Sequence, residues 1–110
     1  EEHAVTFCAG LSANGKIPVF AVYSSFLQRS YDQLIHDIAI QQLPFVLCVD
    51  RAGFVPGDGI THQGIFDVSF LSDIPGWELY SPENDAELAQ VLTDAVSACK
   101  PVAIRYPKGL

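Results

Sequence analysis

The sequence has few basic residues. Of its 110 residues only six are Lys or Arg, against 13 Asp or Glu, and the net charge at pH 7 is −7. A surface that binds nucleic acid needs clustered positive charge to neutralise phosphates, and here the basic residues are scattered along the chain. Attachment to an anionic membrane surface needs the same clustering. The composition therefore argues against a nucleic-acid partner and against a membrane partner.

Long apolar runs and paired cysteines are also missing. No apolar stretch approaches the roughly 20 residues that a membrane-spanning helix needs. The three cysteines, Cys8, Cys48 and Cys99, lie far apart within apolar segments, and we expect all of them to be buried and reduced. No Cys-x-x-Cys pair or His/Cys cluster has the spacing of a metal site, so we expect no metal ligands in this chain.

What the sequence does contain is a regular alternation of predicted helices and strands within a single folded domain. Periodic apolar residues predict a short helix or turn over 68–74 and longer helices over 1–13, 25–42 and 84–99. Runs of β-branched and aromatic residues predict strands over 17–23, 45–49, 77–80 and 102–106. This alternation predicts an α/β fold, in which a parallel sheet carries helices on both faces.

Several local details follow from the same patterns. The strand over 17–23 is apolar throughout, so we expect it to be buried on both faces. Ser24 is the expected N-cap of the second helix, and Glu1 is expected in the first turn of the first. Asn84 and Glu87 have the spacing of a capping box for the last helix. The expected buried stripe of that helix is Leu88, Val91, Leu92 and Ala95.

Residues 50–67, DRAGFVPGDGITHQGIFD, predict a long irregular loop after a buried strand. Its glycines and Pro56 disfavour regular structure, and loops of about 15 residues in a compact domain usually bind ligands or carry active sites. The loop holds groups that can bind phosphate, orient hydroxyls or transfer protons: Arg51, Asp58, Thr61, His62 and Gln63. Ligands of open parallel sheets bind beyond the carboxyl ends of the strands, where residues 23–29 and Lys108 are also expected.

Four segments taken together resemble one enzyme family. They are EEHAVTF (1–7), YSSFLQRSYDQ (23–33), the loop at 50–67, and IRYPKG (104–109). In order and composition they are similar to the 1-deoxy-D-xylulose-5-phosphate synthases, which use thiamine diphosphate to join pyruvate to D-glyceraldehyde 3-phosphate with release of CO2. The resemblance covers essentially all 110 residues. It implies part of the family's transketolase-like, pyrimidine-binding middle domain, with the diphosphate-binding and C-terminal domains outside this chain.

The resemblance assigns three residues to the cofactor. Glu1 matches the family glutamate that hydrogen-bonds N1′ of the aminopyrimidine, and so promotes proton removal at the thiazolium ring. Phe26 matches the aromatic residue that stacks on the pyrimidine, and Arg29 lies beside it. The resemblance also implies Mg2+, bound by a domain that is absent here. We therefore expect the segment alone to be inactive.

Five residues are assigned by the same resemblance to the substrates. Tyr23, Arg51, Asp58 and His62 match residues of the acceptor site. Arg51 would bind phosphate, Asp58 would hold a hydroxyl, and His62 would act in catalysis as a proton donor. Lys108 stands where the family usually has arginine, and it would bind phosphate as a point charge.

The resemblance further implies a homodimer, a role in isoprenoid and thiamine biosynthesis, and a location in the bacterial cytoplasm or the plastid stroma. Two alternatives stay open. Transketolase or the β subunit of a 2-oxo-acid dehydrogenase would share Glu1 and the strand–helix pattern, although the motifs at 23–33 and 50–67 favour the synthase. The other is a truncated, non-catalytic copy. The joint presence of four site residues argues against it: Glu1, Phe26, Asp58 and His62.

Overall fold

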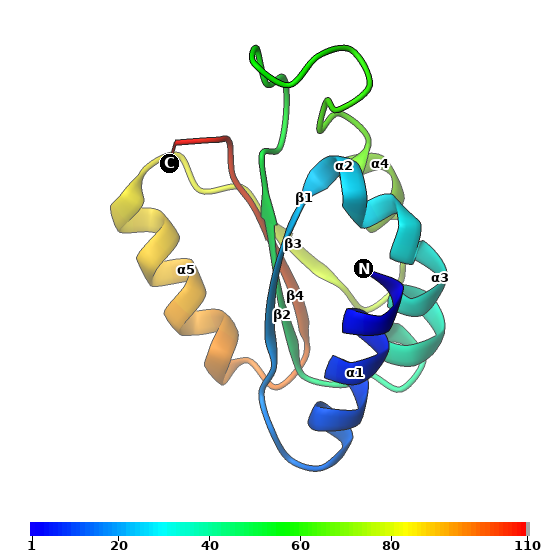
Figure 1. Ribbon diagram of the computed structural model, residues 1–110. Coiled ribbons are helices and arrows are strands. Elements are labelled where there is room, and N and C mark those ends of the chain that lie inside the picture. Colours follow the sequence, from blue (N-terminus) through cyan, green and yellow to red (C-terminus); the bar gives the residue numbers. More distant parts are fainter. Residues whose placement is uncertain (110) are drawn as a thin grey trace.

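The computed structural model describes residues 1–109, which form an open sheet of four parallel strands with helices on both faces (Figure 1). The strands are β1 (Val19–Tyr23), β2 (Phe45–Asp50), β3 (Glu78–Tyr80) and β4 (Pro101–Arg105). They lie in the order β1-β2-β4-β3, and every neighbouring pair is parallel. The predicted α/β class and parallel sheet are confirmed.

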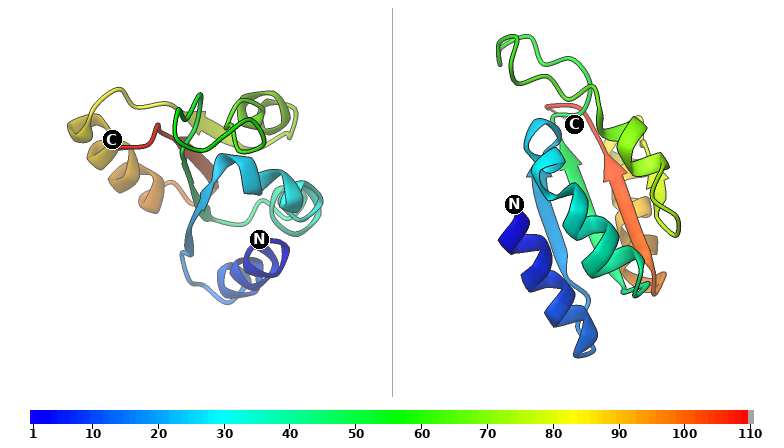
Figure 2. Two further views of the ribbon diagram at one scale, coloured as in Figure 1. Left: turned by 45° about the horizontal axis from the view of Figure 1, so that its top comes forward. Right: turned by 90° about the vertical axis from the view of Figure 1, so that its right-hand side faces the viewer.

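The helices are unequally divided between the two faces of the sheet. One face carries α1 (Glu2–Ala13), the helical stretch over 24–39 and α4 (Asp67–Ser72), whereas α5 (Asp85–Ser97) covers the other (Figures 1 and 2). Successive residues of β2 point to opposite faces, so they divide between two cores. The larger core includes Val5, Leu27, Leu34, Ile38, Phe45, Leu47, Val49 and Leu71. The smaller core consists of Val46, Cys48, Ala95, Val102 and Ile104.

Strand β1 lies at an edge of the sheet, and the prediction that it is buried on both faces is wrong. Its exposure alternates along the strand: Val19, Ala21 and Tyr23 are exposed, while Phe20 and Val22 pack against the larger core. Helix α5 contacts β2 and β4. An apolar sequence shows that a strand can be buried, but the neighbours that cover it are set by its place in the sheet.

The second predicted helix is not one regular helix. It consists of four short pieces, α2 (Ser24–Leu27), η1 (Gln28–Ser30), α3 (Tyr31–Gln33) and η2 (Leu34–Ala39). η2 is a π-helix, which is wider than an α-helix. For example, the N–H of Ile40 donates to Ile35 O, five residues back. The helical path ends earlier than predicted, and Gln42 adopts a left-handed conformation (φ 52°) before the chain enters β2.

Ser24 is not the N-cap of this helix, contrary to the prediction. The helix begins at Ser24 itself, Tyr23 takes the cap position, and the Ser24 hydroxyl is buried without a hydrogen-bond partner among the described residues. Ser24 packs instead against Gly64 of the loop, where a Cβ atom would lie 2.8 Å from Ser24 Cβ. A tertiary contact has therefore replaced the local cap.

The ends of the other helices largely follow their predicted signals. Glu1 is the N-cap of α1 and Glu2 occupies its first turn, a shift of one residue from the prediction. Asn84 Oδ1 accepts a hydrogen bond from Glu87 N (2.9 Å), which confirms the cap of α5, although the Glu87 carboxylate returns to Glu83 N rather than to Asn84 N. Of the expected stripe on α5 only Ala95 is fully buried, since α5 is the only described helix that packs on this face.

The cysteines divide between core and surface. Cys8 and Cys48 are buried, and burial raises the pKa of both thiols. Cys99 is exposed in the turn after α5, where its φ is 55°, so the prediction of a buried side chain is wrong for this residue. Within residues 1–109, no helix combines the length and the apolar character that crossing a membrane would require.

Candidate functional site

The loop of residues 51–66 projects beyond the carboxyl ends of the strands (Figures 1 and 2). Its two arms meet at Gly53 and Gly64, whose backbones exchange hydrogen bonds of 2.6 and 2.9 Å. Gly64 is needed there because a Cβ atom would lie only 2.3 Å from Arg51 O. The predicted irregular loop is confirmed, and a close backbone contact pins it at its start.

A buried ion pair fixes the end of the loop. Asp67, the first residue of α4, is 1% exposed, and its Oδ2 accepts a hydrogen bond of 2.6 Å from Arg105 Nε at the end of β4. The pair and the Gly53–Gly64 contact together form what we call the base of the loop. Sequence reasoning assigned no role to either charged residue. The available signal was Arg105 itself, because a charge at the end of an apolar strand needs a partner.

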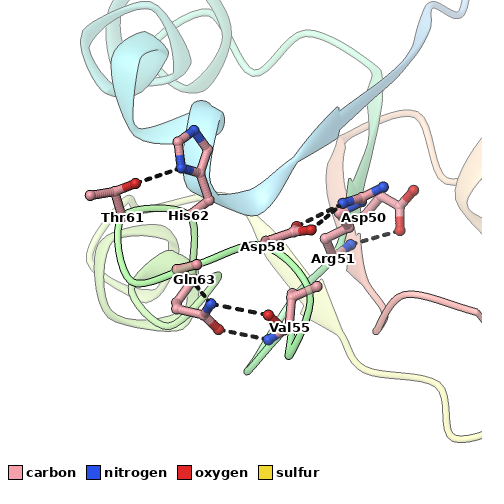
Figure 3. Close-up of polar contacts among 8 residues, drawn as sticks. Asp50, Arg51, Val55, Asp58, Thr61, His62 and Gln63 are labelled. Carbon is pink, nitrogen blue, oxygen red and sulfur yellow. Dashed lines mark hydrogen bonds and ion pairs between the residues drawn. The ribbon is translucent and has the colours of Figure 1, made fainter.

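Arg51 stands at the first position of the loop in a left-handed conformation (φ 53°), which is uncommon for a residue with a side chain. Its N–H donates to Asp50 Oδ1 (2.6 Å), and its Nη1 lies 2.7 Å from both carboxylate oxygens of Asp58 (Figure 3). Both side-chain contacts use Nη1, so Nε and Nη2 can still donate to an anion. Strained backbone of this kind is characteristic of functional sites.

Electrostatics keep this pair ionised. The hydrogen bond from Arg51 lowers the pKa of Asp58, against the opposing effect of burial, and the nearby positive charges of Arg51 and Lys108 lower it further. The hydrogen bond to Asp58 likewise raises the pKa of Arg51. Lys108 thus lies close enough for its charge to act on Asp58, although it is an exposed residue after β4.

A stack of cations and aromatic rings runs from this pair to the N-terminus. The Arg51 guanidinium lies 4.3 Å from the centre of the Tyr23 ring, and the Tyr23 and Phe26 rings are stacked with centres 5.9 Å apart. The Arg29 guanidinium lies 5.0 Å from the Phe26 ring centre. Arg29 Nη1 is in turn 3.5 Å from Glu1 Oε2. Cation–π and stacking contacts each contribute modestly, but together they hold the side chains in a fixed order.

His62 faces the same place from the loop. Its ring meets the Phe26 ring edge-on, with centres 5.5 Å apart, and its Nδ1 lies 2.7 Å from the Thr61 hydroxyl (Figure 3). A hollow of about 330 Å³ opens here. It is lined by Tyr23, Ser25, Phe26, Arg51, Gly57, Asp58 and His62.

The structure therefore brings the sequence-selected residues together. Tyr23, Phe26, Arg51, Asp58 and His62 line the hollow, and Arg29 connects Phe26 to Glu1. Ser25 and Gly57 also line it, and sequence reasoning did not single them out as site residues. Short side chains that merely leave space carry no chemical signal of their own.

Gln63 shapes the loop from within (Figure 3). Its Oε1 accepts a hydrogen bond from Val55 N (2.7 Å), and its Nε2 donates to Val55 O (3.1 Å) and to Gly59 O (2.6 Å). One amide thus satisfies three backbone groups across the loop. We assign it to positioning the segment that carries Asp58 and His62.

No group of three or more His, Cys, Asp or Glu side chains within residues 1–109 is arranged to hold a metal ion. What the site does offer is an aromatic face, two arginines, two carboxylates and an imidazole. Such a set can stack a flat ring, hold an anion and transfer a proton.

A second hollow, of about 250 Å³, lies between α5 and β3. Its main polar groups satisfy one another: Lys100 donates to Glu78, and the Tyr80 hydroxyl donates to the same carboxylate at 2.8 Å. These contacts lower the pKa of Glu78. No residue selected from the sequence for a site lines this hollow, so we do not assign it to the function.

Comparison with known proteins points to one family. Residues 1–110 match the family described as transketolase, pyrimidine binding domain. The 1-deoxy-D-xylulose-5-phosphate synthase of Natranaerobius thermophilus is 54% identical over 109 residues, which are 99% of this chain and 17% of that protein. The synthase of Clostridium kluyveri is 58% identical over 99% of this chain and 18% of that protein. The chain thus spans less than a fifth of the length of these relatives.

Solved structures agree on the fold. A chain described as a split-gene transketolase, inactive beta4 tetramer, is 25% identical, with a TM-score of 0.87 over 100% of this chain and 35% of that chain. Transketolase from Campylobacter jejuni is 19% identical, with a TM-score of 0.88 over 98% of this chain and 17% of that chain. On the full-length match to the family and on this fold, the chain belongs to the transketolase pyrimidine-binding domain family.

Proposed function

We propose that this chain is part of a 1-deoxy-D-xylulose-5-phosphate synthase. The enzyme would decarboxylate pyruvate and join the two-carbon unit to D-glyceraldehyde 3-phosphate, giving 1-deoxy-D-xylulose 5-phosphate and CO2. Relatives at 53–58% identity carry that name. The structural observation that carries the proposal is the convergence of Arg51, Asp58 and His62 on one hollow, joined through Phe26 and Arg29 to Glu1.

The residues at the Glu1 end fit the aminopyrimidine of thiamine diphosphate. The Glu1 side chain is 22% exposed and lies beside Arg29, which contacts the face of Phe26. A partly buried carboxylate near an aromatic face suits a flat heteroaromatic ring with a nitrogen that can be protonated. Glu1 would hold a proton at N1′, Phe26 would stack on the ring, and Arg29 would order both. When bound, the cofactor supplies the carbon nucleophile for decarboxylation.

The other end of the stack fits a phosphorylated aldehyde. Arg51 Nε and Nη2 would bind the phosphate, with Lys108 as a second positive charge. The Tyr23 ring would hold the Arg51 guanidinium through its cation–π contact. Asp58, kept ionised by Arg51, would accept a hydrogen bond from a substrate hydroxyl. His62 would donate a proton to the aldehyde oxygen as the new carbon–carbon bond forms.

The described residues do not fit a divalent metal ion, so no step proposed here uses one. We place Mg2+ and the diphosphate of the cofactor outside residues 1–110, and we infer that this segment alone is inactive. The likeness to the split-gene transketolase chain described as an inactive tetramer supports that inference. We further propose a homodimer in isoprenoid and thiamine biosynthesis, located in the bacterial cytoplasm or the plastid stroma.

The test uses the longest natural chain that contains these residues, with thiamine diphosphate, Mg2+ and pyruvate. We expect CO2 release that depends on D-glyceraldehyde 3-phosphate and that is lost in Glu1→Ala. Glu2→Ala is the matched control, because Glu2 is an exposed neighbour on α1. Transfer of a two-carbon ketol unit without decarboxylation would instead indicate a transketolase. Turnover by residues 1–110 alone would contradict the inferred inactivity.

A further inference from the structure

We propose that Thr61 is a positioning residue, which holds His62 in the tautomer that carries its proton on Nε2. The inference rests on the proposed function, because that function gives His62 its role as proton donor. Its observation is the contact between Thr61 Oγ1 and His62 Nδ1, at 2.7 Å, between adjacent residues of the loop (Figure 3).

The chemistry of the two groups sets the direction of this hydrogen bond. A neutral imidazole has one N–H donor and one nitrogen acceptor, whereas a threonine hydroxyl can donate or accept. The imidazole lone pair is the stronger acceptor of the two, so the hydroxyl of Thr61 donates to Nδ1. The proton of His62 then resides on Nε2, since the hydrogen bond made by one ring nitrogen fixes the state of the other.

The geometry leaves Nε2 available to a ligand. In Figure 3 the second ring nitrogen lies on the side of the ring away from Thr61, while the ring itself lines the hollow. Phe26 meets the ring edge-on, an apolar contact that limits rotation of the imidazole without competing for its nitrogens. A proton donor to an aldehyde oxygen must present an N–H, and the Nε2-protonated tautomer presents it here.

The backbone on either side of His62 is also held. His62 N donates to Gly59 O (3.4 Å), and the next residue, Gln63, is anchored by its three hydrogen bonds to Val55 and Gly59. The hydroxyl of Thr61 therefore acts on a side chain whose backbone is already held in place. Its specific contribution is the tautomer and the ring orientation rather than the fold of the loop.

The experiment compares Thr61→Val with Thr61→Ser in the longest natural chain that contains the segment. Histidine labelled with 15N reports the tautomer, and the resonances of His62 are identified by their absence in His62→Gln. We expect Thr61→Val to replace the Nε2-protonated pattern by a mixture of tautomers. We expect kcat for triose-dependent CO2 release to fall about tenfold, with little change in the KM for pyruvate. Thr61→Ser should restore both readouts.

Two references keep the result interpretable. Thr93→Val removes an exposed threonine hydroxyl on α5, far from the loop in sequence, and should change neither readout. His36, whose Nδ1 lies 2.8 Å from Asp32 Oδ1, should keep its spectrum in every variant. An unchanged His62 tautomer in Thr61→Val would overturn the proposal. Full activity of His62→Gln would overturn the proposed role of His62 instead, and the tautomer measurement would still decide the role of Thr61.

Discussion

Two arginine–aspartate pairs hold the 51–66 loop: Arg51–Asp58 lies within it, and Arg105–Asp67 lies at its end. The pairs differ in accessibility and in backbone conformation. At the hollow, Arg51 and Asp58 have side chains that are 24% and 17% exposed, and Arg51 has a left-handed backbone. At the base, the Asp67 side chain is fully buried and Arg105 is 22% exposed. The first pair is open to a ligand and the second is closed to one. The loop thus combines a fixed base with a part that is open to a ligand. We call that part, formed by Arg51, Asp58 and His62, the rim of the site.

The largest effect on stability is expected from Asp67→Asn. Removing one charge of a buried pair leaves the other without its partner, and this costs about 3 kcal/mol. Hydrogen exchange of peptides from α4, β4 and the loop, measured in the longest natural chain, should show the loss as faster exchange. Asp73→Asn, at the exposed C-cap of the same helix, is the control and should have no effect. Unchanged exchange in Asp67→Asn would mean that the base is not held by this pair.

Gly64→Ala tests the other half of the base, with a somewhat smaller effect. The new methyl group would lie 2.3 Å from Arg51 O and 2.8 Å from Ser24 Cβ, so backbone must move. Overpacking of this kind costs about 1–3 kcal/mol. Gly57→Ala is the matched control in the same loop, because a Cβ atom there meets nothing within 4 Å. Equal exchange rates in the two variants would show that the Gly53–Gly64 contact does not fix the loop.

Unlike the two variants of the base, Asp58→Asn should change stability only a little and function strongly. Its carboxylate is partly exposed, and an ion pair that water can reach contributes less to folding than a fully buried one. Under the proposed function, the variant loses a charged partner for a substrate hydroxyl. We expect kcat/KM for D-glyceraldehyde 3-phosphate to fall about tenfold to a hundredfold. A variant with normal kcat/KM and a destabilised loop would erase the distinction between the two pairs.

The same residue gives the rim a pH dependence. The pKa of Asp58 is lowered below its ordinary value of 3.8, chiefly by the hydrogen bond from Arg51. A lowered pKa stabilises the folded loop at every pH above that ordinary value, and the stabilisation is lost as the pH falls through the folded pKa. Thermal melts of the natural protein should therefore show an acid-sensitive component below pH 3.8 that Asp58→Asn lacks. Identical acid limbs would contradict the lowered pKa.

The rim of the site could be predicted from the sequence because its signals are local. The loop composition identified Arg51, Asp58 and His62, and the rule for parallel sheets placed them at one end of the strands. The resemblance to a family added Glu1 and Phe26. The structure brings these residues together, while their roles in binding and catalysis remain predictions.

The base could not be predicted, because it depends on contacts between distant segments. Asp67 finds its partner in β4, and Gly64 meets Ser24 at the start of α2. The residues of each contact lie far apart in the sequence, so no local motif or spacing predicts that they meet. Ser24 is an example of a local pattern that a distant contact overrides. As a serine before a predicted helix it fitted the N-cap pattern, but it packs against the loop and is the first residue of the helix instead.

The smallest effect expected concerns Tyr106, which directly follows β4 and contacts the chain on either side of Arg51. Its backbone accepts a hydrogen bond from Ala52 N (3.0 Å) and donates one to Val49 O (3.0 Å), while burial raises the pKa of its phenol from 10 to about 12. A raised pKa means that the unfolded chain releases this proton first. The stabilisation is therefore complete below pH 10 and is lost as the pH rises from 10 to about 12. The ultraviolet difference titration between the natural protein and Tyr106→Phe should have its midpoint near 12. A midpoint near 10 would mean that water reaches the phenol, and the chain after β4 would then be as open at this point as the rim.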